Sequence, residues 1–509
     1  MPDGISEGEM LSRIRQARLD KLEELRARGV EPFAYSYGVT HLATPSAAEF
    51  EALGEGRGGE IAGRWAGRMV ALRSHGGSSF ADLEDHTGRL QAHFRRNVLG
   101  EELYSLIPLL DLGDWIGVEG ALFRTRAGEV TIGATDLALL CKSLRPLPFG
   151  KVAQDAESGA AVTHSGLSDR EARYRQRYTD LAVHPERREV FRARASVVSA
   201  IRAFLDGLGY LEVETPVLQP LYGGATARPF QTHHHALDRT LYLRIADELY
   251  LKRLIVGGMH RVYEIAKDFR NEGIDRYHNP EFTMLECYQA FADYETMMGL
   301  VEQLVLEAAT AAGCGEELSY QGSRIHLATP FQRISFVGSL AEAIGADPIT
   351  APLSDLRASA EALGARDLAA ADRGKLLDKL FGLAVQPALL QPTFVVNYPA
   401  FLSPLAKEKR GAPGVTERFE LFAAGQEIAN AFSEQNDPIA QRTALEEQAA
   451  LRAAGDLEAH AVDEDYLMAL EYGLPPTGGV GIGIDRLVML LTDQPSIRDV
   501  IIFPTLRSP

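Results

Sequence analysis

The chain has 509 residues, of which 46% are hydrophobic and 24% are charged, as in globular proteins, and at roughly 150 residues per domain we expect two to four domains. Its 70 acidic and 52 basic residues give a net charge of −18. No apolar run approaches ~18 residues, the N-terminus is acidic, and the three cysteines are widely spaced. The sequence therefore excludes membrane, secreted and fibrous proteins, and we expect a cytoplasmic protein with no membrane partner.

The first predicted element is a helix over residues 9–28, within an N-terminal helical extension of residues 1–58. Apolar residues recur at helical spacing from Leu11 to Leu25, and Gly29 can end the helix. Six of its residues are basic, namely Arg13, Arg15, Arg18, Lys21, Arg26 and Arg28. The helix is either a solvated amphipathic helix or one that faces RNA, and the sequence leaves both open.

Over residues 59–148, short alternating apolar stretches are separated by Gly and Asp turns, with one helical interruption. Several short strands of this kind predict a small β-barrel. The acidic net charge argues against a nucleic-acid partner, although a basic patch can lie on an acidic protein. Residues 149–167 are small and polar without periodicity, so we predict a linker there.

Residues 168–509 are predicted to form a mixed α/β body. It begins with a helix over 189–207, which has an apolar stripe, and a strand over 210–218. Residues 296–390 are rich in Ala and Leu, are predicted to be mostly helical, and carry little functional signal.

Charged side chains concentrate in residues 261–294, which are predicted to form a strand, a polar loop and a second strand. They include Arg270, Glu272, His278, Glu281 and Glu286. Because alternate residues of a hairpin share one face, these side chains can line one site. A surface ion-pair network would have the same composition and remains the alternative.

Residues 417–437 hold a second group of acidic side chains around a sharp turn at Gly425. Glu420 and Glu427 stand among apolar residues, which implies partial burial, and buried carboxylates require a cation. Oxygen ligands suit Mg²⁺, so we predict a magnesium site here, with two solvent-facing glutamates as the alternative. In residues 478–486 (GGVGIGIDR), glycine at every second position is typical of a strand that another group approaches closely, not of a dinucleotide-binding loop.

Four stretches of the sequence together resemble the class II lysine–tRNA ligases (lysyl-tRNA synthetases). They are motif 1 (about 189–218, with Pro216), the segment 223–254, the motif 2 region (about 261–294), and residues 427–437 with motif 3 (about 478–495). The match runs from about residue 60 to residue 504, in the family's order throughout.

The resemblance implies an α+β fold in which an N-terminal OB-fold β-barrel, over residues 59–148, precedes a class II catalytic domain over residues 168–509. That domain is expected to contain an antiparallel six-stranded sheet flanked by helices, and to form a homodimer. The implied partners are ATP, L-lysine and tRNA(Lys), with Mg²⁺ as cofactor. The implied reaction activates lysine to lysyl-adenylate and transfers it to the 3′ end of tRNA, mainly by positioning and charge neutralisation.

By resemblance, the expected catalytic residues are Arg270, on the α-phosphate and the substrate carboxylate, and Arg486, on the terminal phosphate. Phe282 is expected to stack on adenine. The resemblance also assigns Glu272, His278, Asn279 and Glu420 to the ATP site. Glu420 and Glu427 are the expected ligands of a Mg²⁺ ion that bridges the phosphates.

Lysine carries two ammonium groups, so its pocket is expected to hold carboxylates at two separated positions. The resemblance places Glu248 and the backbone of Gly224 on the α-amino group, and Glu434 with Tyr288 on the ε-ammonium. The other lysine-binding residues it implies are Arg270, Glu286, Asn430 and Phe432. A substrate without the ε-ammonium would leave Glu434 buried and unpaired, so discrimination of about 10⁴-fold is expected without an editing site.

In the barrel, Phe80 and Gln91 match the family's anticodon-reading positions, with Arg68 and Glu129 nearby. Proteins read single-stranded RNA by stacking its bases on exposed aromatic rings, although Phe80 could instead belong to the barrel core. The run His233–His235 suggests zinc, but the family has a similar segment without metal and no cysteine lies close in the sequence.

Two other interpretations remain open at this point. One is a lysine-activating paralogue that modifies a protein, and such paralogues resemble the catalytic domain alone. The other is a non-catalytic RNA-binding paralogue, which would be expected to lose the residues that bind ATP. The barrel and the arginines Arg270 and Arg486 favour the ligase.

Overall fold

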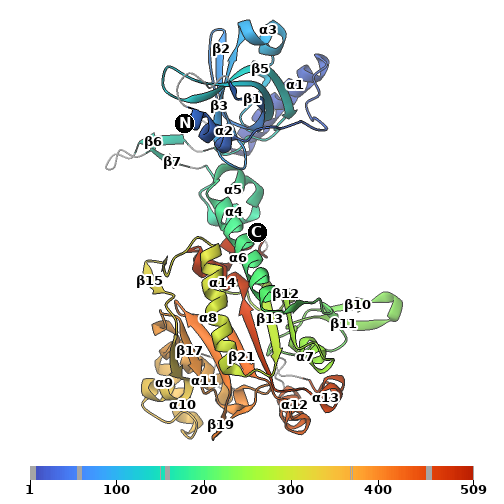
Figure 1. Cartoon of the computed structure of the whole chain (residues 1–509), viewed down its shortest axis with the longest axis vertical. Helices are drawn as coiled ribbons and strands as arrows, with labels where there is room; N and C mark the ends of the chain where they lie inside the picture. The colour runs from blue at the N-terminus through green and yellow to red at the C-terminus, as the bar shows by residue number, and fades with distance from the viewer. Residues whose placement is uncertain are drawn as a thin grey trace. The chain divides into compact units, whose positions relative to one another are not determined.

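The computed structural model of the chain describes residues 7–53, 60–149, 151–154, 161–164, 166–366, 368, 371–453 and 461–507 (Figure 1). It divides into two compact units: Met1–Arg173 with Tyr178–Val183, and Tyr174–Arg177 with His184–Pro509. Within the described ranges, no helix is long and apolar enough to cross a membrane.

The first unit contains a closed barrel with the strand order β1-β2-β3-β5-β4. Its strands are β1 (Ala62–His75), β2 (Ser78–Glu84), β3 (Arg89–Arg95), β4 (Trp115–Arg124) and β5 (Val130–Cys141). Alternate residues such as Ile116, Val118 and Ile132 point inward and are fully buried, as a half-buried strand requires. The predicted barrel is therefore confirmed.

The N-terminal helix α1 (Glu7–Ala27) packs against this barrel through Leu25, which joins its core, and α2 (Ala43–Leu53) adds Phe50. The basic residues of α1 fall into two groups. Arg18 and Lys21 bind the barrel segment around Asp111, whereas Arg13, Arg15 and Arg26 are exposed.

Among its described residues, the first unit also contains several short helices and a hairpin. The helices are α3 (Arg96–Tyr104), η2 (Ile107–Leu109), α4 (Arg170–Arg175, which continues into the second unit) and α5 (Arg177–Val183). Within the segment 149–167, expected to be a linker, β6 (Lys151–Gln154) pairs antiparallel with β7 (Ala161–His164), and residues 155–160 lie outside the described ranges.

The second unit is built on a sheet with the strand order β16-β17-β20-β21-β22-β13-β12-β8. The bounds are Gln332–Ser335, Thr393–Val396, Arg418–Ala423, Gln426–Ser433, Thr477–Gly483, Glu281–Ala290, Arg261–Phe269 and Leu211–Glu212. The six central strands pair antiparallel, and the two edge strands β16 and β8 pair parallel to their neighbours. The expected six-stranded antiparallel sheet is thus present, with one parallel strand added at each edge.

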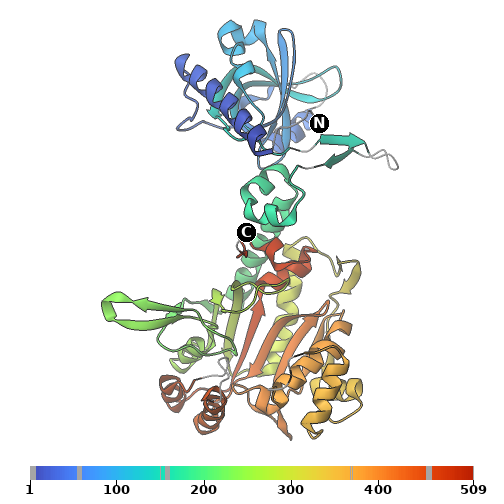
Figure 2. The ribbon, with the colours of Figure 1, turned by 180° about the vertical axis from the view of Figure 1, so that it is seen from behind.

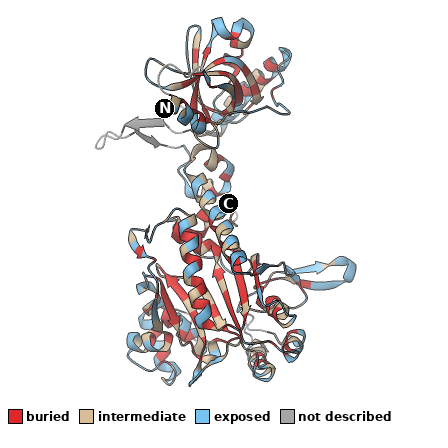
Figure 3. Ribbon diagram, in the orientation of Figure 1, coloured by how far each residue is buried: buried red, intermediate tan, exposed pale blue. Residues whose placement is uncertain are grey.

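Helices α6 (Arg187–Gly207), α8 (Tyr294–Ala311) and α14 (Ile484–Leu491) supply apolar side chains to the main core of this unit. Figure 1 shows α8 lying across one face of the sheet. In Figure 3, the strands under this helix are largely buried, as is the helix itself. The opposite face, which Figure 2 shows from behind, is the one that remains available for a site.

The remaining elements surround the sheet. The strands are β9 (Leu218–Gln219), β10 (Gln231–His234), β11 (Arg239–Leu243), β14 (Glu317–Tyr320), β15 (Ser323–His326), β18 (Glu408–Lys409) and β19 (Ala412–Thr416). The helices are η3 (His235–Leu237), α7 (Glu248–Val256), α9 (Phe336–Ile344), α10 (Leu353–Ala362), α11 (Arg373–Ala384), η4 (Gln386–Ala388), η5 (Ala400–Leu402), α12 (Pro438–Ala453), α13 (Glu464–Glu471) and α15 (Ile497–Val500).

Two predicted elements differ from the structure. The strand expected over 210–218 is reduced to the short strands β8 and β9, because Pro216 between them has no N–H to donate to a ladder. Residues 296–390, expected to be mostly helical, also contain the strands β14, β15 and β16.

Candidate active site

The four strands β20, β21, β22 and β13 place alternate residues on opposite faces of the sheet. Phe419, Ala431, Val480 and Leu285 are buried in the core that α8 helps to form. Their neighbours along each strand therefore face the other side, where they line a cavity of about 690 Å³. This volume is in the range of small-molecule sites.

The cross-strand register arranges these cavity residues in two parallel rows. The first row is Glu420, Asn430, Gly481 and Glu286, and the second is Arg418, Phe432, Gly479 and Tyr288. Each row thus carries a glycine in the middle, on β22, and larger polar or aromatic residues on both sides. The floor of the cavity is therefore a glycine strip, formed by Gly479 and Gly481 on β22, and the side chains of β21 and β13 form a wall on each side of it.

The glycines of this strip have different surroundings. A Cβ at Gly479 would lie 2.2 Å from Oε1 of Glu434 and 2.3 Å from the ring of Tyr288, whereas the nearest atoms to a Cβ at Gly481 would be 3.7 Å away. The expected close approach to the strand of alternating glycines is confirmed at Gly479. At Gly481, a side chain would instead stand in the cavity.

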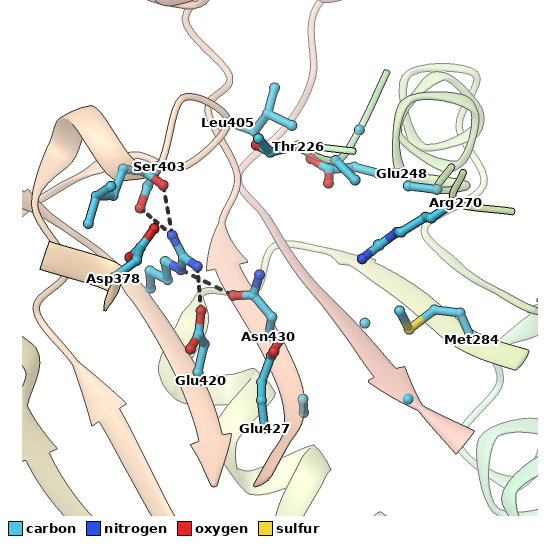
Figure 4. A pocket seen from close by; sticks show the side chains of 18 of the residues that line it. Thr226, Glu248, Arg270, Met284, Asp378, Ser403, Leu405, Glu420, Glu427 and Asn430 are labelled. Atoms are coloured by element: carbon cyan, nitrogen blue, oxygen red, sulfur yellow. Dashed lines mark hydrogen bonds and ion pairs between the residues drawn. The ribbon is translucent and has the colours of Figure 1, made fainter. Parts of the chain in front are cut away.

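The cavity brings together nearly all the residues expected in the catalytic domain. Those that line it are Gly224, Glu248, Arg270, Glu272, His278, Asn279, Phe282, Glu286, Tyr288, Glu420, Glu427, Asn430, Phe432 and Arg486. Figure 4 shows Glu248 and Arg270 on one side and Glu420 and Glu427 on the other. Glu434 is not among the lining residues, because its carboxylate is fully buried behind the wall.

Two arginines stand at different parts of the cavity. Arg270, at the end of β12, has its guanidinium carbon 5.0 Å from the centre of the Phe282 ring. Arg486, on α14, donates to Glu427 Oε2 at 3.2 Å and contacts Nε2 of His278 at 3.3 Å. The two cations can therefore act on two different parts of an extended anionic ligand.

Glu420 is held by two partners that the sequence analysis did not single out. Arg418 donates to Oε1 of Glu420, and the Tyr398 hydroxyl donates to Oε2 at 2.8 Å. Arg418 also donates to Asn430 Oδ1 at 3.2 Å, so it joins the two rows (Figure 4). Burial raises the pKa of Glu420 to about 7, although Arg418 opposes the shift. Because burial disfavours the ionised form of this carboxyl group, a cation bound nearby would stabilise it.

The expected burial of the acidic pair holds for one member more than for the other. The Glu420 side chain is 14% exposed, whereas that of Glu427 is 39% exposed. The pair therefore combines a carboxylate fixed in the wall with one that faces the open cavity. Only oxygen atoms are offered, which suits a hard divalent cation such as Mg²⁺.

A group of buried acids lies around Glu248 and Glu286. Arg244 pairs with Asp247 at 2.9 Å and with Glu264 at 2.7 Å, and Tyr288 donates to Glu286 at 3.0 Å. Burial, reinforced by neighbouring carboxylates, raises the pKa of Glu286 well above its usual range. This end of the cavity therefore holds several carboxyl groups close together, and a cationic ligand would stabilise their ionised form.

Comparison with known proteins agrees with this geometry. The family described as tRNA synthetases class II (D, K and N) matches residues 169–507, and the OB-fold nucleic acid binding domain matches residues 64–140. The lysine–tRNA ligase of Moorella thermoacetica is 52% identical over 495 residues, covering 97% of this chain and 98% of that protein. That of Carboxydothermus hydrogenoformans is 49% identical, covering 98% and 99%. The chain belongs to the class II lysine–tRNA ligases.

Among these lysine–tRNA ligase residues, Asn279 is already engaged by the backbone. Its amide nitrogen donates to the Glu281 carbonyl at 2.6 Å, and its oxygen accepts from the Thr505 N–H at 3.2 Å. Its side chain therefore fixes the loop before β13 while it lines the cavity.

Sequence reasoning also missed the first turns of α11. Asp372, Gly374 and Asp378 line the cavity, although residues 296–390 were expected to carry little functional signal. Burial raises the pKa of Asp378, although the charge of Arg418 opposes the shift. No motif marks this helix, because its approach to the site depends on tertiary packing.

On the barrel, Phe80 lies outside the core cluster and is partly exposed, which removes the alternative of a core residue. Its ring stacks on His93 at 4.1 Å between centroids, and Phe123 continues the aromatic row at 6.0 Å. Gln91 donates to Glu129 at 2.9 Å, so these two predicted residues meet.

Arg68 and the histidine run are placed differently from Phe80. Arg68 pairs with Glu84 in the strand register and stacks on Trp115, whereas Phe80 pairs with Arg73 further along the same strand.

In the run His233–His235, the side chain of His233 contacts the exposed Asp238 at 3.3 Å.

Proposed function

We propose that the chain activates L-lysine with ATP to lysyl-adenylate and then transfers lysine to the 3′ end of its tRNA. The observation that carries this proposal is the combination in one cavity of arginines for an anion with buried carboxylates for a cation. The full-length likeness to lysine–tRNA ligases supports the same reaction.

The first step forms a bond between a lysine carboxylate oxygen and the α-phosphorus of ATP, while the bond to the β-phosphate oxygen breaks and pyrophosphate leaves. Two anions must approach each other, so neutralising their charge lowers the barrier. Arg270 is assigned to the α-phosphate and the lysine carboxylate, and Arg486 to the terminal phosphate. Phe282 is assigned to adenine, with Glu272 and His278 nearby.

Glu420 and Glu427 are the residues assigned to Mg²⁺. The fit rests on their oxygen-only donors and on the raised pKa of the buried Glu420, which a cation would lower. A bound Mg²⁺ ion would neutralise phosphate charge beside Arg486. Arg418 and Tyr398 hold the Glu420 carboxylate in place through hydrogen bonds to its two oxygens.

Lysine is assigned to the acidic end of the cavity. Glu248 and the backbone of Gly224 would take the α-amino group, and Tyr288 with Glu434 the ε-ammonium. Gly224 has a φ of 86° and lies under Glu248, where a Cβ would come within 3.2 Å of that side chain. Glu286, Asn430 and Phe432 would complete the walls around the methylenes.

The barrel is assigned to the tRNA anticodon, and the catalytic units are proposed to form a homodimer. The aromatic row of Phe80, His93 and Phe123 supports the first assignment, because bases stack on rings that solvent can reach and all three rings are partly exposed. The rival activity, lysine transfer to a protein, gives this row no role.

Lysine-dependent ATP–pyrophosphate exchange by the purified chain tests the first step, with aspartate and asparagine as control substrates. Exchange driven by either control instead of lysine would overturn the specificity. Charging of bulk tRNA with lysine tests the second step. Exchange with lysine but no charging of tRNA would favour the protein-modifying alternative.

A further inference from the structure

Lys252 on α7 is a buried cation within the acidic end of the cavity. Its side chain is 0% exposed, and its ammonium lies 2.5 Å from Oε1 of Glu248 and in contact with Oε2 of Glu434. Removing an ammonium from water is costly unless it is paired, and here it is paired twice. The chain thus keeps an ammonium of its own in a site assigned to an ammonium substrate.

The two glutamates that share Lys252 are those assigned to opposite ends of lysine. Glu248 lines the cavity, whereas Glu434 lies behind it with 1% exposure. Lys252 engages one oxygen of each. Oε1 of Glu434 accepts no hydrogen bond from any described residue, and it lies beside the glycine strip at Gly479, which itself lines the cavity. One oxygen of Glu434 is therefore held by Lys252, and the other lies beside the floor of the cavity at Gly479.

Resting on the function proposed above, we propose that Lys252 is a positioning residue for lysine recognition. Its ammonium ties Glu248 and Glu434 together, favours the ionised form of Glu434, and leaves one oxygen of each carboxylate for a substrate ammonium. Lys252 does not touch the reacting atoms. It sets the spacing of the two carboxylates that recognise the substrate.

This role makes lysine binding depend on pH. Lys252 is faced by Glu248 on its own helix, Glu434 after β21, Tyr466 on α13 and the ring of Tyr288 on β13. Burial raises the pKa of Glu434 to about 8, and Lys252 opposes that shift. Without the Lys252 charge, the pKa of Glu434 rises further. The carboxyl then stays protonated and cannot pair with an ammonium.

The test is the KM for lysine and the KM for ATP in pyrophosphate exchange, measured across pH for wild type and K252M. Truncating one partner of a buried charge pair predicts a rise in the lysine KM of about 30-fold or more near neutral pH, with the ATP KM within about threefold. Wild-type lysine KM should fall between about pH 7 and pH 9, as Glu434 ionises, and in K252M this fall should move to higher pH.

R253M is the matched control. Arg253 follows Lys252 on α7, and its ion pair with Asp463, at the start of α13, lies outside the lining of the cavity. R253M should leave the lysine KM and its pH profile unchanged. If K252M does not fold, K252Q replaces it, since glutamine keeps polar contacts without the charge and should show the same shift of the pH profile.

The outcomes separate the two proposals. A wild-type protein without lysine-dependent exchange overturns the proposed function and this inference with it. A wild-type protein that is active, beside a Lys252 variant with an unchanged lysine KM and pH profile, overturns this inference alone. Equal rises in the lysine and ATP KM values would also overturn it, because they indicate a structural role only.

Discussion

Arg418 offers a direct measure of how much the buried charges of the site contribute to stability. Its guanidinium donates to Glu420, to Asn430, to the Leu402 carbonyl at 2.8 Å and to Ser403 Oγ at 2.9 Å. In R418M, methionine keeps most of the apolar stem and removes the charge and all these donors. The Glu420 carboxylate then stays buried and keeps the hydrogen bond from the Tyr398 hydroxyl.

Removing one partner of a buried ion pair costs about 3–5 kcal/mol, so we expect R418M to lower the free energy of unfolding by about that amount at neutral pH. R442M is the control, because Arg442 forms an ion pair with two hydrogen bonds to Glu464 on the surface. An exposed pair contributes only about 0.2–1 kcal/mol. The contrast between the two variants isolates burial from the mere presence of an ion pair.

Urea denaturation in magnesium-free buffer measures both values by linear extrapolation. The cost of R418M should shrink as the pH falls, because burial already raises the pKa of Glu420 and a protonated carboxyl needs no counter-charge. A loss in R418M as small as that in R442M, or one independent of pH, would refute the reasoning.

Three further predictions follow from the glycine strip, the buried acids and the barrel. G481A should leave the melting temperature unchanged but raise the KM for lysine or ATP, whereas G479A should cost about 1–3 kcal/mol through its clash with Glu434 and Tyr288, and equal stability of the two variants would contradict this. Because burial raises the pKa of Glu420 to about 7 and that of Asp268 to about 6, the folded ligand-free chain binds more protons than the unfolded chain. Its melting temperature should therefore fall as the pH rises from about 5 to 8, and Mg²⁺ with lysine should reduce the fall; a melting temperature independent of pH would argue against this. F80A should raise the KM for tRNA about 5- to 100-fold, as expected for one lost stacking contact, without changing pyrophosphate exchange, and unchanged charging would remove Phe80 from the anticodon site.

Much of the fold and site could be predicted because it depends on local patterns. Alternating apolar residues predicted the barrel strands, and the glycine alternation from Gly479 predicted a strand that other groups approach closely. The apolar neighbours of Glu420 and Glu427, around the turn at Gly425, predicted partial burial of these carboxylates. In each case, the signal lies within a few neighbouring positions of the chain.

The sequence did not reveal the roles of Lys252 and Arg418, because these roles depend on contacts between distant segments of the chain. Lys252 reads as an ordinary helix lysine until β21 brings Glu434 to its ammonium, 182 positions further along the chain. Arg418 is adjacent in sequence to the charged Glu417 and resembles a surface residue until Tyr398 and Phe432 enclose it. Charge alone does not reveal burial, and burial is what gives these side chains their effect.

The anchoring of Arg18 has a practical consequence for studies of the N-terminal segment. Its guanidinium donates to the carbonyls of Ser143 at 2.9 Å, Arg145 at 3.1 Å and Leu112 at 3.0 Å, which would otherwise lose their donors. Deleting the first thirty residues would therefore destabilise the barrel as well as remove the helix. Weakened RNA affinity after such a deletion would say little about direct contacts between the helix and RNA. Charge reversal at the exposed Arg13, Arg15 and Arg26 separates the two effects.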